Sequence, residues 1–323
     1  MKDFHQLVQV CRGCKVYIQT HNFPDPDAIA SAFGLQDLLK RFDINATLCY
    51  AGRIDKLNTA KMLGCFGIEM FAYEDLDMKP EDAIICVDSQ KYNGNITDFI
   101  GNEIACIDHH PTYKQADYQY ADLQITGACA TLIARYYRDL GLVPDRNVAT
   151  ALLYGIRMDT LQFSRGVTQL DIDMFGFLFP YCDQKSLAGL ERNNLQFQDL
   201  QAYSSAIDNI SIYGGLGITG INFSCPDGLI ATLSDFILSL EEVVIAVVYS
   251  FREDGIKFSV RSEISEVHAG DLVRAALSGL GEGGGHQEMA GGLVKKEQRY
   301  LLGKYPETVI RERFLEALEP VMA

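Results

Sequence analysis

Three apolar runs of this chain end in histidine or aspartate, and this pattern restricts most strongly what it can fold into. The runs are "KVYIQTH" (15–21), "DAIICVDS" (82–89) and "EIACIDHH" (103–110). Continuous apolar runs of this length are typical of strands in a parallel sheet whose two faces are both covered. Helical patterns alternate with them at 28–42, 128–140 and 146–160. The first part of the chain therefore predicts an α/β domain with a mostly parallel sheet flanked by helices.

The pattern changes after about residue 179. A Gly-rich, strand-like stretch and a hairpin pattern at 243–262 are followed by a helix pattern at 271–280. We expect "GEGGGH" (281–286) to be a loop, "GGLVKK" a strand and the end of the chain a helix. The expected domains are 1–185, which is the α/β domain, and 209–323, which is a smaller α/β domain with a mixed sheet. Residues 186–208 are expected to form a helical linker.

Composition and charge limit the partners. The formal net charge is −15 over 323 residues. A surface this acidic disfavours long nucleic acids, because non-specific affinity for them comes from Lys and Arg at the phosphates. The N-terminus has no signal-peptide pattern and no apolar stretch is long enough for a membrane span. Nine cysteines without a framework, including the lone Cys11–Cys14 pair, favour ordinary thiols in a cytoplasmic protein.

Acidic and histidine side chains follow the predicted strands at the points where ligands bind in open α/β sheets. They are His21, Asp25, Asp27, Asp88, Asp108, His109 and His110, and Asp159 follows a helix. Carboxylates with a few imidazoles and no thiolate suit manganese or magnesium. The number of ligands is sufficient for two ions if one carboxylate bridges them, and such a site promotes phosphoryl displacement by water. The chain has no G-x-S-x-G elbow and no Walker A loop.

The order of these motifs resembles the DHH phosphoesterase family. "HNFPDPDA", "VDS", "IDHHP" and "MDT" resemble its four motifs in order, and "GEGGGHQEMAGG" resembles the glycine-histidine motif of the DHH-associated second domain. Size and the second domain resemble the nano-RNases, some of which also act on 3′-phosphoadenosine 5′-phosphate. The chain departs from those members at Leu161 and at residues 287–289.

The resemblance implies a role for each motif residue. One metal would be held by His21, Asp25 and Asp88, and a second by Asp27, Asp88, His109 and Asp159. Asp108 would orient an imidazole, and His110 would face the substrate phosphate. In the second domain Arg261, Gly283, Gly284, Gly285 and His286 would bind the substrate. The ions would be two divalent metals, manganese first, with magnesium or cobalt as alternatives.

We therefore expect a manganese-dependent phosphoesterase whose substrate, a short oligonucleotide or a nucleotide, lies in a cleft between the two domains. A homodimer is compatible with this interpretation. Two alternatives stay open at this point. One is a pyrophosphatase or exopolyphosphatase on the same metal domain, although the "GGGH" block argues against the pyrophosphatase branch. The other is a nucleotide-binding regulator without catalysis, against which the complete set of ligands argues.

Overall fold

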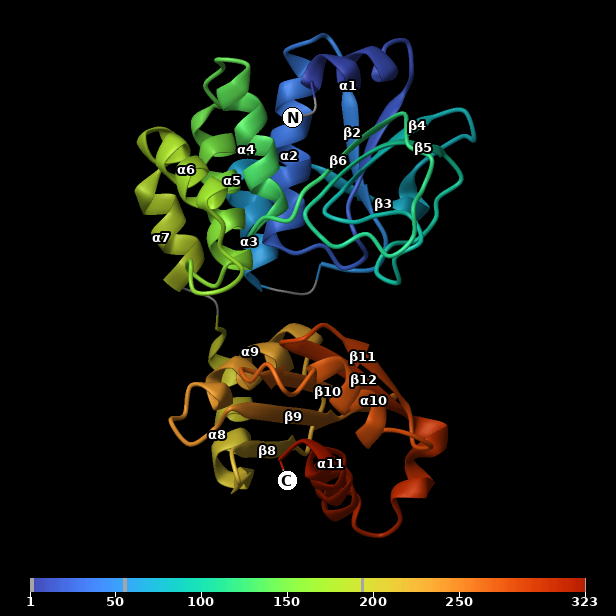
Figure 1. Ribbon diagram of the computed structural model, residues 1–323, viewed down its shortest axis with the longest axis vertical. Helices are drawn as coiled ribbons and strands as arrows, with labels where there is room; N and C mark the ends of the chain where they lie inside the picture. The colour runs from blue at the N-terminus through green and yellow to red at the C-terminus, as the bar shows by residue number, and fades with distance from the viewer. Residues whose placement is uncertain (1–2, 55–56, 193–194, 323) are drawn as a thin grey trace. The chain divides into compact units, whose positions relative to one another are not determined.

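The structure is a computed structural model that describes residues 3–54, 57–192 and 195–322. The chain divides into two compact units, Met1–Asn194 and Leu195–Ala323 (Figure 1). The boundary lies inside the segment predicted as a linker. That segment holds most of helix α7 (Gln184–Arg192), which buries Leu187 and Leu190 in the first unit, and helix α8 (Leu200–Asn209), which belongs to the second.

The first unit is built on a six-stranded sheet with the order β3-β2-β1-β4-β5-β6, in which all neighbours are parallel. Its strands are β1 (Val16–Gln19), β2 (Ala46–Tyr50), β3 (Met70–Ala72), β4 (Ala83–Val87), β5 (Asn102–Asp108) and β6 (Tyr120–Leu123). The chain builds outward from β1 through β2 to β3 and then returns to place β4 on the other side of β1. The order of the strands therefore reverses between β1 and β4, and this is where such sheets bind ligands.

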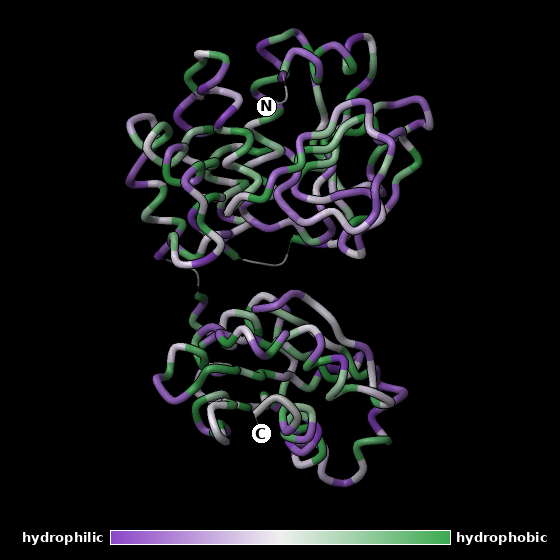
Figure 2. The backbone as a smooth tube through the Cα atoms, in the orientation of Figure 1, coloured by the Kyte–Doolittle hydropathy of each residue, from purple (hydrophilic) through white to green (hydrophobic). Residues whose placement is uncertain are grey.

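Helices cover one face of this sheet, and loops cover the other. The helices are α1 (Phe4–Cys11), α2 (Pro26–Lys40), α3 (Leu57–Phe66), α4 (Cys129–Asp139), α5 (Arg146–Asp159), α6 (Gln169–Leu178) and α7. Alternate residues of β1 separate the two cores: Val16 and Ile18 pack with the helices, whereas Tyr17 packs with loop residues such as Phe99. Figure 2 shows the hydrophobic colour along the central strands of both units.

The second unit has a mixed six-stranded sheet with the order β11-β12-β10-β9-β8-β7. The strands are β7 (Ser211–Tyr213), β8 (Leu216–Ile221), β9 (Ile245–Phe251), β10 (Gly255–Ser262), β11 (Glu282–Gly285) and β12 (Met289–Lys295). In the described part of this second sheet, β8 and β9 pair in parallel and the other neighbouring strands pair antiparallel. Helices α8 and α9 (Asp227–Leu238) cover one face, and α10 (Ala269–Ala276) and α11 (Pro306–Met322) cover the other. These observations confirm the predicted α/β class and the mixed second sheet.

Two expectations about local structure need correction. The segment "GEGGGH" is not a loop, because residues 282–285 form the edge strand β11, paired antiparallel with β12. The short strands β3 and β6 were not predicted, because neither has a long apolar run. Both are edge strands, so a single neighbour supplies their pairing.

None of the described helices has the length and apolar character that crossing a bilayer would require.

The glycines of β11 allow close packing by α10. A Cβ atom on Gly283 would lie 2.2 Å from Val273 Cγ1, and one on Gly285 would lie 2.4 Å from the Met289 carbonyl oxygen. At Gly284, by contrast, the nearest atom would be the Arg274 guanidinium at 3.7 Å. The space at Gly283 is therefore filled by the helix.

We expect Gly283→Ala to destabilise the protein and Gly284→Ala to have little effect. The β-branched Val273 is held in the helix and cannot move aside freely, so the added methyl group should cost about 1–3 kcal/mol of unfolding free energy. Denaturant unfolding of the two variants and the parent measures the difference. Equal midpoints for the Gly283 and Gly284 variants would contradict this packing role.

Candidate metal centre

The loop after β1 places His21 beside Asp25. Asp25 is the N-cap of α2, and its Oδ1 accepts the backbone N–H groups of Asp27 (3.0 Å) and Ala28 (3.1 Å). Pro26 opens the helix at a position where a missing N–H has no cost. Nε2 of His21 lies 3.7 Å from Oδ1 of Asp25. The helix cap thus holds one carboxylate at the histidine.

Asp27 is held by the N-terminus of α4. Its Oδ2 accepts the N–H of Cys129 at 2.7 Å, and its Oδ1 accepts the N–H of Ala130 at 2.9 Å. The side chain is buried, and the helix N-terminus stabilises a negative charge at this position. The two aspartates of "DPD" are therefore fixed by two different helices, Asp25 by α2 and Asp27 by α4.

Asp88 follows β4 and lies between two histidines. Its φ of 56° is left-handed, a conformation that Asp tolerates better than most residues. Oδ2 lies 3.6 Å from Nε2 of His21, and Oδ1 lies 3.2 Å from Nε2 of His109. The carboxylate is therefore in the position that a bridge between two ions would need.

His109 follows the first part of the "DHH" motif at the end of β5, and its ring orientation is set by the backbone. Nδ1 donates to the carbonyl oxygen of Thr126 at 2.9 Å, so Nε2 carries the free lone pair. Nε2 lies 3.4 Å from Oδ2 of Asp159 at the end of α5 and 4.0 Å from Oδ2 of Asp27. Side chains from helix α5 and from the first turn of α2 thus converge on one nitrogen at the end of β5.

Asp108 orients His110. Its Oδ1 accepts Nδ1–H of His110 at 2.8 Å, and its Oδ2 accepts the side-chain amide of Gln90 at 2.8 Å. Burial raises the pKa of Asp108, but the bonds from His110 and Gln90 outweigh it and hold that pKa below its usual range. Burial lowers the pKa of His110, but Asp108 and Asp88 outweigh it, and the pKa is raised.

Negative charge is concentrated at this centre. Burial raises the pKa of Asp27 well above its ordinary value, and the nearby charges of Asp88 and Asp159 raise it further. Burial also raises the pKa of Asp159 to about 6, with a contribution from Asp25. Bringing so many carboxylates together is unfavourable unless cations offset their repulsion.

The donor set fits divalent cations. In the described part of the chain, the groups able to hold a metal are His21 with Asp25 and Asp88, Asp27 with His109 and Asp159, and Asp88 with Asp108, His109 and His110, each within 4.8 Å. Oδ1 of Asp88 and Nε2 of His109 are buried without a hydrogen-bond partner. Buried polar atoms normally have partners, and an ion would supply one here. Carboxylates and imidazoles suit manganese or magnesium.

The second unit brings its predicted residues together at one end of its sheet. Arg261 on β10 pairs with Met289 on β12, across from the turn that contains His286. Nε of Arg261 donates to Asp235 of α9 at 2.6 Å. His286 is exposed, and its backbone N–H donates to the carbonyl oxygen of Met289. Substrate binding by these residues and by Gly283–Gly285 stays a prediction.

Several residues of the centre had no signal in the sequence. Gln90 and the Thr126 carbonyl orient the two histidines of the motif, as described above. Arg165 donates to the carbonyl oxygen of Asp159 at 2.9 Å, and its guanidinium lies 3.9 Å from Oδ1 of the same residue. Such roles depend on contacts between loops. The "DHH" motif predicted the two histidines, but not the residues that hold them.

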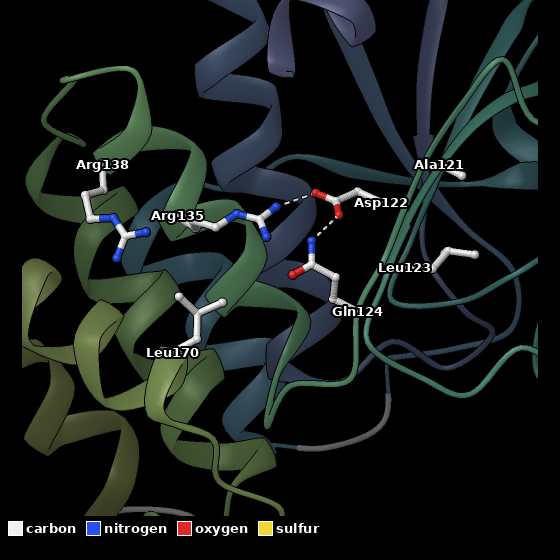
Figure 3. Close-up of a pocket in the computed structure, with 7 residues that line it drawn as sticks. All are labelled: Ala121, Asp122, Leu123, Gln124, Arg135, Arg138 and Leu170. Carbon is white, nitrogen blue, oxygen red and sulfur yellow. Dashed lines mark hydrogen bonds and ion pairs between the residues drawn. The ribbon is translucent and has the colours of Figure 1, made fainter. Parts of the chain in front are cut away.

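A separate pocket lies at the outer edge of the first sheet (Figure 3). It is lined by Ala121, Asp122, Leu123, Gln124, Arg135, Arg138 and Leu170. Arg135 is paired with Asp122, which also accepts from Gln124. Arg138 is paired with Asp139, which lies outside the lining. Because both arginines of this pocket already have carboxylate partners, it is a weaker candidate for an ionic substrate than the histidine–aspartate cluster.

Comparison with known proteins gives this cluster its family context. The model of the DHH family N-terminal domain matches residues 15–156, and the model of the DHHA1 domain matches residues 215–310. The chain carries a DHH N-terminal domain followed by a DHHA1 domain. All the predicted ligands except Asp159 lie inside the match to the DHH domain, and Arg261 and His286 lie inside the match to the DHHA1 domain.

Similar proteins have different names and lengths. An uncharacterized protein of Methanocaldococcus jannaschii is 28% identical over 309 residues, which cover 93% of this chain but only 63% of that protein. A probable manganese-dependent inorganic pyrophosphatase of Streptococcus suis is 29% identical over 161 residues, 48% of this chain and 51% of its own length. The chain thus spans less than two thirds of either relative.

A solved structure shares the whole fold. The crystal structure of an exopolyphosphatase-related protein from Bacteroides fragilis superposes with a TM-score of 0.80 over 99% of this chain and 96% of its own. The sequences are 20% identical. This comparison shows that the fold occurs in another protein, and it carries no argument about the substrate.

We expect metal binding to release protons at pH 7.5. Burial lowers the pKa of His21, but Asp25 and Asp88 outweigh it and raise that pKa to about 9. The metal-free imidazole is therefore protonated at neutral pH and must lose its proton to become a ligand, so affinity should increase as the pH rises toward 9. Below about pH 6, Asp159 also takes up a proton, and affinity should fall further.

Calorimetric titration with Mn²⁺ in buffers of different ionisation enthalpy measures this release. We expect about one proton or more per chain at pH 7.5, fewer as the pH approaches 9, and a smaller release from His21→Gln at pH 7.5. Identical heats in all buffers at pH 7.5 would contradict the role of His21 as a ligand.

Proposed function

We propose that this chain is a two-metal phosphoesterase that hydrolyses phosphate esters of short oligonucleotides or small nucleotides, with manganese as its metal. The observation that carries this proposal is the position of Asp88. The carboxylate lies between His21 and His109 at the switch point of the sheet, and its Oδ1 is buried without a hydrogen-bond partner. The resemblance to nano-RNases supports the class of substrate.

The residues divide into those that would hold the metals and those that would act on the substrate. His21, Asp25 and Asp88 would hold one ion, and Asp27, Asp88, His109 and Asp159 the other. When bound, two divalent ions activate water and stabilise the charge of a phosphoryl group during displacement.

His110 would act directly on the substrate. Its Nδ1–H is engaged by Asp108, so Nε2 would be the atom that contacts a phosphate oxygen. Its raised pKa favours the protonated form, which can donate a hydrogen bond or a proton. Asp108 would position this ring and keep it charged, with Gln90 holding the carboxylate.

The DHHA1 domain would hold the remote part of the substrate. Arginine suits bidentate recognition of phosphate, and Arg261 and His286 would supply this contact. A chain with a net charge of −15 has no continuous basic track for a long strand. The proposed partners are therefore short nucleotides, with no long nucleic acid and no membrane.

A second candidate is hydrolysis of pyrophosphate or polyphosphate. The name of the Streptococcus suis protein favours it. The pyrophosphatase match, however, covers only 48% of this chain. The DHHA1 domain and its "GGGH" segment argue for a substrate with a remote group to be held.

We expect a preference for short substrates. With Mn²⁺, di- to penta-nucleotides should be hydrolysed with a kcat/KM at least about tenfold above that of long single strands, because little positive charge is available to follow a strand. The panel should include 3′-phosphoadenosine 5′-phosphate, cyclic dinucleotides, pyrophosphate and polyphosphate. Processive degradation of a long oligomer, or faster turnover of pyrophosphate than of any nucleotide, would contradict the proposal.

A further inference from the structure

Large apolar side chains are exposed in the same loops that carry the candidate metal ligands. They are Phe23 (58% exposed), Tyr92 (54%), Tyr113 (76%), Ile125 (67%) and Leu161 (44%), which we call the apolar rim. Phe23 lies between His21 and Asp25, and Tyr113 follows His110 in the same loop. Ile125 precedes the residue whose carbonyl holds His109. The rim residues therefore lie next to candidate ligands in the sequence, and Ile125 lies next to the residue that holds His109.

The backbone of the rim is strained. Phe23 (φ 56°), Tyr92 (φ 75°) and Leu161 (φ 45°) are in the left-handed region, which bulky residues rarely adopt. Such conformations are unfavourable and occur preferentially at functional sites. Exposing an apolar side chain adds to this cost. A strained backbone that presents apolar groups to solvent has no benefit for folding, and this points to a ligand.

Phe23 is fixed in position. Its N–H donates to the carbonyl oxygen of Ala51 at 3.1 Å, and its ring lies against Gly52, where an added Cβ would be 2.9 Å from the ring edge. The preceding Asn22 donates its N–H to Asn95 at 2.7 Å and accepts from Thr97 at 3.1 Å. Two neighbouring loops therefore fix the backbone at Phe23, Gly52 lies against an edge of the ring, and more than half of the residue stays exposed.

The two tyrosines belong to neighbouring loops. The ammonium group of Lys114, next to Tyr113, lies 4.1 Å from the centroid of the Tyr92 ring. This cation–π contact links the loop after β4 to the loop after β5. Aromatic rings are thus presented by the loops after β1, β4 and β5, the three strands that carry most of the candidate ligands.

We infer that the apolar rim binds a nucleobase of the substrate, with Phe23 as the stacking platform, and that it selects nucleoside phosphoesters over inorganic phosphate chains. This inference deepens the proposed function and rests on it for the identity of the reacting phosphate. Bases stack on aromatic side chains through their flat faces whatever their sequence. A base is also uncharged, so it can approach the carboxylates of the centre without repulsion. Pyrophosphate and polyphosphate have no apolar surface to use such a rim.

A fluorescence experiment tests base binding without catalysis. The chain contains no tryptophan, so Phe23→Trp introduces a single indole at the rim. We expect saturable quenching of that indole by adenosine monophosphate in the full chain with Mn²⁺, and none by ribose 5-phosphate. The matched control is Tyr181→Trp. Tyr181 lies away from the candidate centre. Its neighbour in the chain, Asp183, donates its backbone N–H to Thr150 near the start of α5, whereas Asp159 lies at the end of that helix.

A kinetic experiment tests selectivity. The two substrates are a dinucleotide and its abasic counterpart with the same phosphodiester. Phe23→Ala should lower the ratio of their kcat/KM values about tenfold, within the range for loss of one base–aromatic stack. Phe23→Tyr, which keeps a ring, should preserve the ratio, as should Tyr181→Ala.

The outcomes separate this inference from the proposed function. An unchanged ratio in Phe23→Ala, or equal responses of Phe23→Trp to adenosine monophosphate and ribose 5-phosphate, overturns the inference even if the protein hydrolyses nucleotides. Quenching by adenosine monophosphate in a protein that hydrolyses no phosphoester supports base binding and overturns the proposed function.

Discussion

Asp88→Asn is expected to abolish turnover while leaving the fold intact. Asn tolerates the left-handed φ of 56° that Asp88 adopts, so the backbone should not change. The Asn amide, however, cannot offer a negatively charged oxygen on the side of His21 and another on the side of His109. We expect kcat to fall by at least about 10³-fold, which corresponds to about 4 kcal/mol. The number of Mn²⁺ ions bound per chain, measured by equilibrium dialysis, should fall below two.

The matched control is Asp82→Asn, at the opposite end of β4. Asp82 is also buried, and it accepts the N–H of Lys79 at 2.9 Å and pairs with Lys15 at 3.6 Å. Its loss should lower stability but should leave kcat per folded molecule nearly unchanged. If Asp88→Asn retained more than about a tenth of the parent kcat, a loss of only about 1.4 kcal/mol, the two-metal assignment would fail.

Arg261→Ala and His286→Ala are expected to lower kcat/KM for nucleotides by about 10²-fold, or about 2.7 kcal/mol, without loss of metal. Neither residue belongs to a group of candidate metal ligands in the described chain. Binding energy from a remote phosphate can be expressed at the reacting centre, so kcat can fall together with affinity. The defect should be smaller for bis-p-nitrophenyl phosphate, which has no remote phosphate.

Arg252→Ala is the control for the arginine. Arg252 is paired with Asp227 at the start of α9, whereas Arg261 is paired with Asp235 further along the same helix. Both variants remove an ion pair to α9, but only Arg261 lies beside the turn of His286. Similar losses in the two arginine variants, equal losses on both types of substrate, or loss of Mn²⁺ would assign these residues to the fold or to the metals.

The sequence alone was sufficient to identify the chemistry of the candidate centre. His21, Asp88, His109 and Asp159 each lie at the end of an apolar run or a helix, so the end of the element and the polar side chain are read from the same few residues. His21, Asp88 and His109 were predicted in this way, and the structure places both histidines within 4 Å of the Asp88 carboxylate. Local patterns also predicted the mixed sheet of the second domain, because its hairpins have clear turns.

The pairing of elements could not be read in the same way. Edge strands β3 and β6 have little pattern of their own and form because a neighbour supplies hydrogen bonds. The glycines at 283–285 were expected in a loop, but in the fold they form an edge strand against which α10 packs. A run of glycines indicates that another element packs closely against the backbone, but it does not indicate which element this is.

By itself the sequence determined which side chains are present and at which strand ends they lie, because strand ends and their polar residues are local features. Only the tertiary structure decided that β1 and β4 are neighbours, so that His21 and Asp88 meet at the point where the strand order reverses. It also decided that Asp27 is held by α4, that His109 is held by Thr126, and that strained loops expose Phe23 beside the centre. These features depend on contacts between segments far apart in the chain, and no local pattern of residues encodes them.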